Sequence, residues 1–374
     1  MKSNAMLFLS NASIMMTVIF IPLFADMLGA SRLEIGIMGS SYGIALFFSS
    51  YLFGRSSDTR DKRMFLKAGF LIAAASFFMQ VFARDAVSLT IIRALCGFAV
   101  GIFTAPLIVY NLESGGKMGI FSSYGALGWA VGGGIAGIIA QITESVFQTD
   151  GLISYWAVFL LSSIFFFISF LISINLPKIP VRKMHVPLFP VELIKKNLWV
   201  YISMLLRNTG AFALWIIFPL FLMDLGANKF WIGAIFFVNT FSQFIIMRRL
   251  DIKSDEWLIK GGLLLSALVF FSYSFVTKFY FLIPLQFALA FSYSFVYVGS
   301  LLYLTRTNEE RTTAVGILNS TISLAMVAGP LLGGAISQLW GFFEVMYFAA
   351  GITLLGLLIA MISKSSGGSA PRGE

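Results

Sequence analysis

Long apolar stretches separated by short polar segments form the dominant pattern of this chain. Each stretch runs for roughly 20 residues, about the length an α-helix needs to cross a hydrocarbon core of ~30 Å. The pattern predicts an all-α integral membrane protein with twelve membrane-crossing helices in two sets of six. The first set is expected at 6–28, 34–54, 64–83, 87–110, 118–141 and 152–176, and the second at 197–223, 229–247, 257–276, 279–304, 312–338 and 342–363.

Polar segments divide the chain into two halves. We expect a first six-helix half at residues 1–176, a cytoplasmic linker rich in proline and basic residues at 177–196, and a second six-helix half at 197–364. The small and polar residues 365–374 indicate a flexible or vector-derived tail. The residues before Met6 are set aside in the same way.

The composition supports a membrane protein and excludes several kinds of chemistry. The chain has 58% hydrophobic and 11% charged residues, whereas soluble domains carry about 25% charged residues. One histidine (His185) and one cysteine (Cys96) argue against a metal site and exclude an intrachain disulfide. No phosphate-binding loop motif is present, which argues against an ATP-driven pump. We therefore expect no metal and no cofactor, and scattered carboxylates argue against an enzyme.

Basic residues are distributed unevenly between the two sides of the predicted bundle. The chain has 26 lysines and arginines, and all but six fall in segments on the side of the two termini. Arg93 and Arg207 lie within spans, and the opposite side carries Arg32, Arg84, Lys229 and Lys278. This asymmetry predicts a multi-pass protein of the cytoplasmic membrane with both termini cytoplasmic. Topology accounts for the net charge of +9, so we expect no nucleic-acid partner.

The two halves are related by an internal repeat. A shift of 197 residues aligns Asn11 with Asn208, Pro22 with Pro219, Gly132 with Gly329, and Gly137 with Gly334. A constant offset over several spans indicates duplicated six-helix halves, related by an axis along the membrane normal. Such an arrangement predicts a solute site between the halves. The matched prolines bend their helices and are candidate hinges, although membrane helices also tolerate proline.

The loop after the second span carries a family signature. It reads Gly54-Arg55-Ser56-Ser57-Asp58-Thr59-Arg60-Asp61-Lys62-Arg63 and resembles the signature loop of the major facilitator superfamily (MFS). The resemblance implies the MFS fold and a cytoplasmic gate that latches the halves. We expect Asp58 to face the start of span 11, Asp255 to face the start of span 5, and Glu113 to pair with Arg55 or Lys62. The full set of latch candidates is Gly54, Arg55, Asp58, Lys62, Arg63, Glu113 and Asp255.

Glycine-rich stretches in spans 5 and 11 resemble the MFS motif associated with antiporters. The residues concerned are Gly132, Gly137, Gly329, Pro330, Gly333 and Gly334. Small residues at such spacings also let helix backbones approach closely, so close helix packing is the alternative interpretation. Arg93, in Arg93-Ala94-Leu95-Cys96-Gly97, resembles the span-4 arginine motif of proton-coupled exporters.

Two arginines within the spans dominate the candidate solute site. Buried charges in membranes usually line a cavity or find a partner, and Arg207 lies near the middle of span 7. Because no carboxylate lies near mid-depth, Asp26 at the end of span 1 is the candidate for proton coupling. The candidate substrate-binding residues are Arg207, Asn11, Asn208, Arg93, Trp215, Tyr42, Asn239, Gln243, Tyr124, Tyr293 and Asn319.

These observations predict a secondary transporter that moves a small organic solute by rocker-switch alternating access. The primary expectation is proton-linked efflux or antiport. The alternative within the class is a uniporter or exchanger of organic anions that uses Arg207 and Arg93. An alternative of another class is a receptor or scaffold on the same fold that binds without transporting. Expected partners are the solute, protons and the lipid bilayer, and we expect a monomer.

Overall fold

The computed structural model describes residues 2–57, 60–116, 118–147, 151–178, 190–250, 255–308 and 311–363. All regular elements in this part of the chain are helical. The first half contains α1 (Lys2–Met27), α2 (Arg32–Ser57), α3 (Lys62–Met79), α4 (Ala86–Glu113), α5 (Met118–Phe147) and α6 (Leu152–Ile174). The second contains α7 (Val191–Lys196), α8 (Leu198–Asp224), α9 (Lys229–Arg249), α10 (Asp255–Ser272), α11 (Leu282–Thr307), α12 (Arg311–Leu339) and α13 (Phe342–Ile362).

Twelve of these helices are long and apolar enough to cross a membrane, counted over the described residues. The short helix α7 is the exception, and it forms the end of the expected linker segment. Short 3-10 turns extend α3 at Gln80–Phe82, extend α10 at Tyr273–Phe275 and precede α11 at Phe279–Phe281. The predicted twelve-helix membrane fold is therefore confirmed. Residues 179–189 of the linker and the tail from 364 onward lie outside the described residues.

Two predicted boundaries were wrong. The residues set aside before Met6 belong to α1, where the Ser3 hydroxyl donates a hydrogen bond to Asn111 Oδ1 over 2.8 Å. Helix α5 runs to Phe147 and does not stop at residue 141. Its polar last turns look like a helix end in the sequence, but they continue the helix, and Glu144 within them has a cationic partner from the other half.

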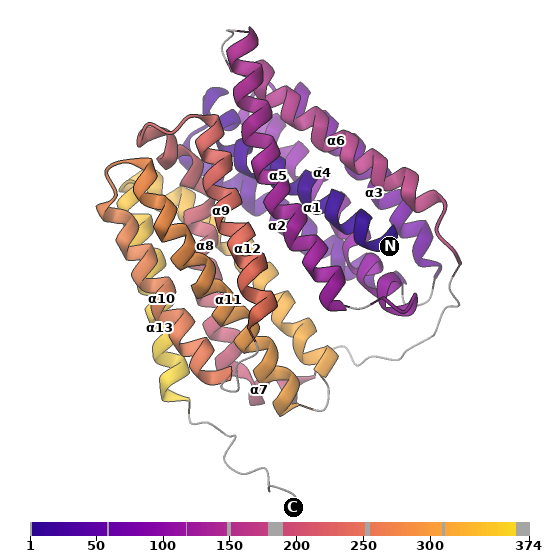
Figure 1. Ribbon diagram of the computed structural model, residues 1–374, viewed down its shortest axis with the longest axis vertical. Helices are drawn as coiled ribbons and strands as arrows, with labels where there is room; N and C mark the ends of the chain where they lie inside the picture. The colour runs from indigo at the N-terminus through magenta and orange to yellow at the C-terminus, as the bar shows by residue number, and fades with distance from the viewer. Residues whose placement is uncertain are drawn as a thin grey trace, which may run out of the picture.

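The two six-helix halves lie side by side and repeat the same internal packing (Figure 1). In the first half α1 packs on α5 and α6, and α2 packs on α4. In the second half the equivalent contacts join α8 with α12 and α13, and α9 with α11. Between the halves, α5 packs on α9 and α2 packs on α12, which are again equivalent pairs. The predicted pseudo-symmetry between two six-helix halves is thus confirmed.

Alternation of the helix directions gives the molecule two distinct ends. We call the end that carries the start of α1, the helix α7 and the end of α13 the linker end. The opposite end, with the connections 28–31, 83–85, 225–228, 276–278 and 340–341, is called the far end. Figure 1 shows the ribbons of the two halves spreading apart toward the linker end.

Glycine pairs bring the halves into contact near the far end. A Cβ atom added to Gly233 of α9 would lie 2.6 Å from the Cα of Gly137 in α5. A Cβ atom added to Gly334 of α12 would lie 2.8 Å from the Cα of Gly36 in α2. Both contacts are too close for any larger side chain, so glycine allows the halves to meet here.

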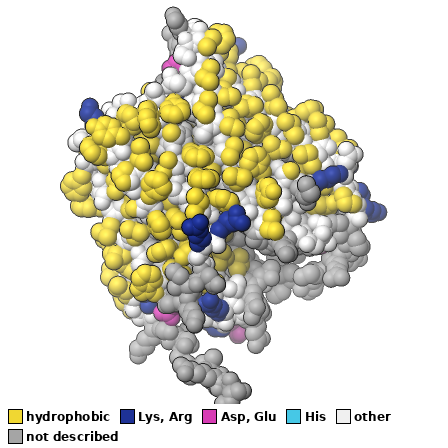
Figure 2. Space-filling view, viewed as in Figure 1, with side chains coloured by type: hydrophobic (Ala, Val, Ile, Leu, Met, Phe, Trp, Pro, Cys, Tyr) yellow, Lys and Arg dark blue, Asp and Glu magenta, His cyan; other side chains and the backbone are white. Residues whose placement is uncertain are grey.

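The outer surface suits a lipid environment. Hydrophobic side chains cover most of the face shown in Figure 2. Phe48 is 64% exposed and Ile362 is 80% exposed. Exposed apolar surface on this scale is typical of a protein whose solvent is the bilayer.

Candidate functional site

Arg207 of α8 is the centre of a polar cluster inside the second half. Its side chain is 4% exposed. Its Nε donates to Ser266 Oγ of α10 over 3.2 Å, and its Nη1 donates to Asn208 Oδ1 over 3.2 Å. The Ser266 hydroxyl in turn donates to Ser292 Oγ of α11 over 3.0 Å. The guanidinium carbon also lies 4.9 Å from the centre of the Tyr293 ring.

The partners of Arg207 are therefore neutral. No ion pair involves it within the described ranges. A buried guanidinium stays charged, and it is held here by hydrogen bonds and by the faces of aromatic rings. The structure places this group among α8, α10 and α11, on the inside of the helix bundle and away from lipid.

Asn208 and Trp215 lie on the same helix and have local partners. The Asn208 amide donates to the carbonyl of Met204 over 2.9 Å, while its oxygen accepts from Arg207. The Trp215 ring packs edge-on against Phe236 of α9, with ring centres 4.9 Å apart. Asn208 thus orients Arg207, whereas Trp215 joins two helices through an aromatic contact.

Asn239 and Gln243 form a second polar pair in this half. Gln243 Nε2 donates to Asn239 Oδ1 over 2.7 Å, one helical turn away on α9. Asn239 Nδ2 donates to the carbonyl of Gln286 in α11 over 3.2 Å. This pair therefore links α9, the eighth span, to α11, the tenth span.

Arg93 and Tyr42 form the corresponding cluster in the first half. Arg93 of α4 is 4% exposed, and its guanidinium carbon lies 4.4 Å from the centre of the Tyr42 ring of α2. Its Nε and Nη1 have no hydrogen-bond partner among the described residues. Arg93 is seven residues from the start of α4 at Ala86, which corresponds to a depth of ~10 Å.

The internal repeat relates these two clusters. The 197-residue shift aligns Tyr42 with Asn239, and both link the second span of their half to the fourth. The arginines themselves do not correspond, because Arg93 aligns with Ala290. The predicted substrate residues thus fall into separate groups within the halves, around Arg207, Asn239 and Arg93, where the sequence suggested a single central set.

The remaining candidates have other surroundings. Asn11 Nδ2 donates to the carbonyl of Gly125 over 3.2 Å, which joins α1 to α5. Tyr124 is 42% exposed, and Asn319 on α12 is also exposed. Asp26, the proton-coupling candidate, is exposed at the far end of α1.

The latch candidates at the linker end have their partners within one half. Lys62 Nζ lies 2.9 Å from Glu113 Oε2, so one expected pairing is present. Asp255 was expected to face the start of α5, but its carboxylate lies 3.8 Å from Arg306 Nη1 of α11 in its own half. The reason is that the halves diverge at this end. Asp58 and the Arg55 side chain lie outside the described residues.

Arg63 and Gly54 complete the latch candidates. Arg63 Nη2 lies 2.7 Å from Asp61 Oδ2, and its Nη1 donates to the carbonyl of Leu176 over 3.2 Å. Gly54 lies in α2, where an added Cβ would be 3.3 Å from the Cβ of Ala105 in α4. These contacts also stay within the first half.

The glycine-rich stretches serve two kinds of helix contact. A Cβ added to Gly132 would lie 2.4 Å from the carbonyl oxygen of Ala12. A Cβ added to Gly333 would lie 2.0 Å from the carbonyl oxygen of Ala213. Gly329 also packs on α8, so this set allows close packing within each half. Gly137 and Gly334 make the contacts between the halves that are described above.

The proline candidates all lie within continuous helices. Pro22 is inside α1, Pro219 inside α8 and Pro330 inside α12. Pro330 also takes part in the contact between the halves, because a Cβ added to Gly36 would lie 2.5 Å from its carbonyl oxygen. The role of the prolines as hinges stays a prediction.

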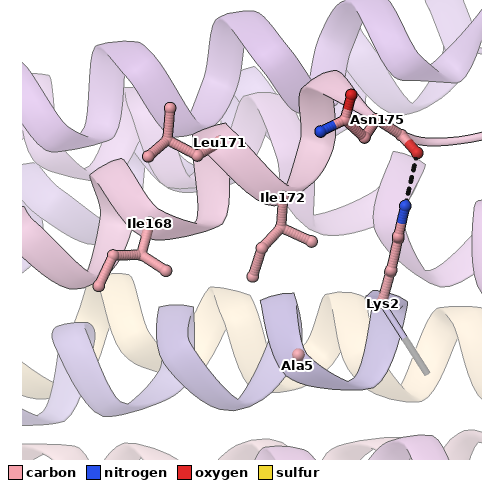
Figure 3. A pocket seen from close by; sticks show the side chains of 6 residues that line it. All are labelled: Lys2, Ala5, Ile168, Leu171, Ile172 and Asn175. Carbon is pink, nitrogen blue, oxygen red and sulfur yellow. Dashed lines mark hydrogen bonds between the residues drawn. The ribbon is translucent and has the colours of Figure 1, made fainter.

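A surface groove lies away from both arginine clusters, between α1 and α6 near the linker end (Figure 3). It has a volume of about 480 Å³ and is lined by Lys2, Ala5, Ile168, Leu171, Ile172 and Asn175. Lys2 Nζ donates to the carbonyl of Asn175 over 2.8 Å. None of the predicted substrate residues contributes to this groove.

Sequence reasoning missed the polar contacts that join the halves at the far end. Arg32 and Lys229 were assigned only to loops on the outer side, yet each contacts the opposite half. Arg32 Nη1 donates to the carbonyl of Ser337 over 3.1 Å, and Lys229 Nζ lies 3.2 Å from Glu144 Oε1. The sequence does contain a signal for these contacts, because the 197-residue shift aligns Arg32 with Lys229.

Duplicated six-helix bundles that enclose buried polar clusters define a membrane carrier. Comparison with known families gives the same class, because residues 4–249 and 200–372 each match the Major Facilitator Superfamily. The chain belongs to this family. It is therefore a multi-pass membrane protein from a family of secondary transporters of small solutes, which are not enzymes.

Known relatives agree with this assignment. An uncharacterised MFS-type transporter of Methanocaldococcus jannaschii is 30% identical over 127 residues, which cover 32% of this chain and 33% of that protein. The matched region thus spans about a third of the relative's length.

Solved structures share the fold. The nucleoside transporter NupG has a TM-score of 0.78 at 14% identity, covering 96% of this chain and 97% of that one. An inward-facing, occupied bacterial homologue of the human lysosomal transporter Spinster has a TM-score of 0.81 at 12% identity, covering 96% and 95%. The human organic anion transporter MFSD10 (TETRAN) has a TM-score of 0.68 at 15% identity, covering 96% and 99%.

Proposed function

We propose that this chain moves a small organic anion across the cytoplasmic membrane by rocker-switch alternating access. The linker end is then the cytoplasmic end, and the excess of basic residues there supports that orientation. The halves contact each other near the far end and spread apart toward the linker end, as expected of a carrier open to the cytoplasm.

The observation that carries the anion proposal is the state of the two buried arginines. Arg207 has only neutral partners in the described part of the chain, and Arg93 has two N–H groups without partners. A buried cation normally requires a compensating charge. A carboxylate or phosphate on the solute would supply that charge as a charge-assisted, bidentate contact to guanidinium.

Both clusters would contribute to one transport cycle. Tyr293 and Tyr297 of α11 are half-buried and stack with ring centres 5.6 Å apart, beside Arg207. They offer an aromatic surface for the organic part of the solute. Asn11, Tyr124 and Asn319 are further candidates for contacts with its neutral polar groups.

Proton-linked efflux is the second candidate. Arg93 lies in the short motif that resembles the span-4 arginine of proton-coupled exporters, and Asp26 has an exposed carboxylate. In this mechanism the solute is neutral or cationic, and a pH gradient drives its exit. The two candidates thus predict different solute charges.

Counterflow into liposomes tests the proposal. Purified protein is reconstituted, loaded with unlabelled solute, and offered labelled monocarboxylates, phosphate esters, or neutral and cationic amines, with and without a pH gradient. We expect carboxylates or phosphate esters to exchange and Arg207→Gln to abolish that exchange. Arg249→Gln, which removes an exposed arginine of α9, is the control and should retain it.

Other outcomes favour the alternatives. Uptake only of amines, driven by the pH gradient, would support efflux and contradict the anion proposal. A solute that raises the unfolding temperature without any counterflow would indicate a receptor or scaffold.

A further inference from the structure

We propose that Lys229 is the principal gate residue at the far end. Its ammonium group occupies a socket in the first half, holds the halves together in the present state, and has to leave that socket whenever the halves separate at this end. The proposal rests on the alternating-access function proposed above and adds the residues that close one side of the pathway.

The socket is built from three kinds of partner. Lys229 Nζ donates to Ser154 Oγ over 2.7 Å and lies 3.2 Å from Glu144 Oε1. It also lies 4.3 Å from the centre of the Tyr155 ring. A hydroxyl, a carboxylate and an aromatic face together satisfy an ammonium group. The contacts are therefore those of a specific cation site.

Every one of these partners belongs to the other half. Lys229 is the first residue of α9, whereas Glu144 is on α5, and Ser154 and Tyr155 are on α6. The lysine is 4% exposed, although its position at a helix end would allow it to extend into water. Because a buried ammonium is stable only with its partners, separation of α9 from this site requires the pairing to break.

Gly151 shows that the socket is fitted to the lysine. It has a φ of +79° and caps the start of α6. A Cβ atom at this position would lie 3.1 Å from Lys229 Nζ. Both the left-handed backbone and the space taken by the ammonium therefore favour glycine here.

The internal repeat places a second cation at the equivalent position. Arg32 begins α2 and aligns with Lys229 through the 197-residue shift. Its guanidinium carbon lies 4.0 Å from the centre of the Phe342 ring in the other half. Its backbone N–H donates to Gln338 Oε1 over 3.0 Å, and Gln338 aligns with Gln141.

A similar contact is present on the other side, with the donor one residue further along its helix. Phe230 N donates to Gln141 Oε1 over 3.5 Å. The cations, the glutamines and the glycine pairs of both interfaces thus follow one offset. This repetition indicates that the far-end contact is a duplicated gate, in which Lys229 and Arg32 are the charged members.

The two sides of the gate differ in strength. Lys229 has a carboxylate partner, while the described contacts of Arg32 are with carbonyl and amide oxygens and an aromatic ring. Of the five ion pairs in the described part of the chain, Lys229–Glu144 is the one that joins the halves. We therefore assign the larger effect to Lys229.

Distances between spin labels test this gate. Cys96 is the single cysteine and is buried, so Cys96→Ala gives a cysteine-free background. Labels at Arg84→Cys and Lys278→Cys report the far end, and labels at Arg60→Cys and Lys195→Cys report the linker end. All four side chains are exposed and lie outside the gate.

Lys229→Met keeps the length of the side chain and removes its charge. We expect the population with long far-end distances to rise at least twofold, together with shorter distances at the linker end. Arg32→Met should give the same change with a smaller amplitude. Distance distributions in folded Lys229→Met that match those of the parent chain would overturn the proposal.

Two further variants serve as a control and as a substitute for Lys229→Met. Lys260→Met removes a lysine whose partner, Glu256, lies one turn away on the same helix, and it should leave both distances unchanged. If Lys229→Met cannot be isolated in folded form, Glu144→Gln takes its place, because Glu144 is 39% exposed and tolerates substitution. Unchanged distances in that variant also contradict the gate.

The outcome is independent of the solute. If the anion proposal fails, counterflow of carboxylates and phosphate esters is absent, while the label distances still respond to Lys229→Met. If the gate fails, counterflow proceeds in the parent chain, while the distances do not respond.

Discussion

The guanidinium of Arg207 lies on the face of Tyr293, with 4.9 Å from its carbon to the ring centre. Two hydrogen bonds, to Ser266 and Asn208, hold the group in that position. Arginine makes its two hydrogen bonds from separate nitrogens, Nε and Nη1, of one planar group that also lies on the ring, and the single ammonium nitrogen of lysine does not reproduce that geometry. The cluster is therefore specific for arginine as well as for positive charge.

Arg207→Lys is accordingly expected to behave as a loss-of-function variant. It keeps the charge but gives up the ring contact and at least one hydrogen bond, each worth about 1 kcal/mol. We expect a lower unfolding temperature and loss of anion counterflow. Tyr293→Phe, which keeps the ring, is the control and should retain the stability. Full transport by Arg207→Lys would show that charge alone suffices.

The fold could be predicted from the sequence almost completely, because each membrane helix carries its own signal. A span must be about 20 apolar residues long whatever its neighbours are, and the repeat then relates the two halves. The errors occurred where a neighbour decides the outcome. Helix α5 continues past residue 141, and Glu144 in this extension pairs with Lys229, a contact 85 positions away in the chain.

The site was less accessible to sequence reasoning. Arg207 and Arg93 stand out as charges within apolar spans, and the structure buries both. Their partners do not stand out, because Ser266 resembles any other helix serine in the sequence. The separation of the candidates into several groups depends on helix rotation, which apolar periodicity fixes poorly when most of a helix is apolar on all sides.

Asp255 shows a different limit. The sequence places it by pseudo-symmetry at an interface between the halves, and that interface exists only when the linker end is closed. In the structure the ribbons of the two halves spread apart at this end (Figure 1), and Asp255 lies 3.8 Å from Arg306 in its own half. A sequence specifies both states of a carrier, so the contacts of one state cannot be deduced from it alone.

Gly333 offers a direct test of close packing between α12 and α8. A Cβ at this position would lie 2.0 Å from the carbonyl oxygen of Ala213, so Gly333→Ala has to push the helices apart. Overpacking of this kind costs about 1–3 kcal/mol, and we expect a clearly lower unfolding temperature.

Gly351 is the matched control for that experiment. It also lies within a helix, but an added Cβ there would meet nothing within 4 Å. Gly351→Ala should be neutral or stabilising, by up to about 1 kcal/mol from helix propensity. Equal unfolding temperatures for the two alanine variants in one detergent would disprove the packing argument.

The Lys62–Glu113 ion pair should stabilise the first half. Lys62 is 5% exposed and Glu113 is 21% exposed, and their charged atoms are 2.9 Å apart. Glu113→Gln leaves the buried ammonium without a counter-charge, which we expect to cost about 1–3 kcal/mol after allowance for partial exposure. Thermal unfolding measures this loss.

A double-mutant cycle separates the interaction energy of Lys62 and Glu113 from the effects of the single substitutions. Lys62→Met combined with Glu113→Gln removes both charges, and replacing both partners of a buried pair is often close to neutral. The double variant should therefore be more stable than Glu113→Gln alone. Additive losses in the cycle would mean that the two residues act independently.

Asp61 predicts a pH dependence at the linker end. Arg63 holds the pKa of this carboxyl below its ordinary value, chiefly through a side-chain hydrogen bond, and the Arg63 backbone N–H also donates to it over 3.1 Å. A lowered pKa in the folded state stabilises the fold above the unfolded pKa of about 3.9. That stabilisation is lost as the pH falls through the folded-state pKa.

Comparison with Asp61→Asn checks the sign of this effect. Asparagine can still cap α3, so the variant removes the charge while keeping the cap. We expect the parent chain to have the higher unfolding temperature near pH 6, and the gap to close as the pH falls from the unfolded pKa of about 3.9 through the lower folded-state pKa. In an Arg63→Gln background, the difference in unfolding temperature at pH 6 between chains with and without Asp61→Asn should be much smaller, because the cation that favours the charged carboxyl is gone. A gap that stays constant across this pH range would show that the charge of Asp61 does not contribute to stability.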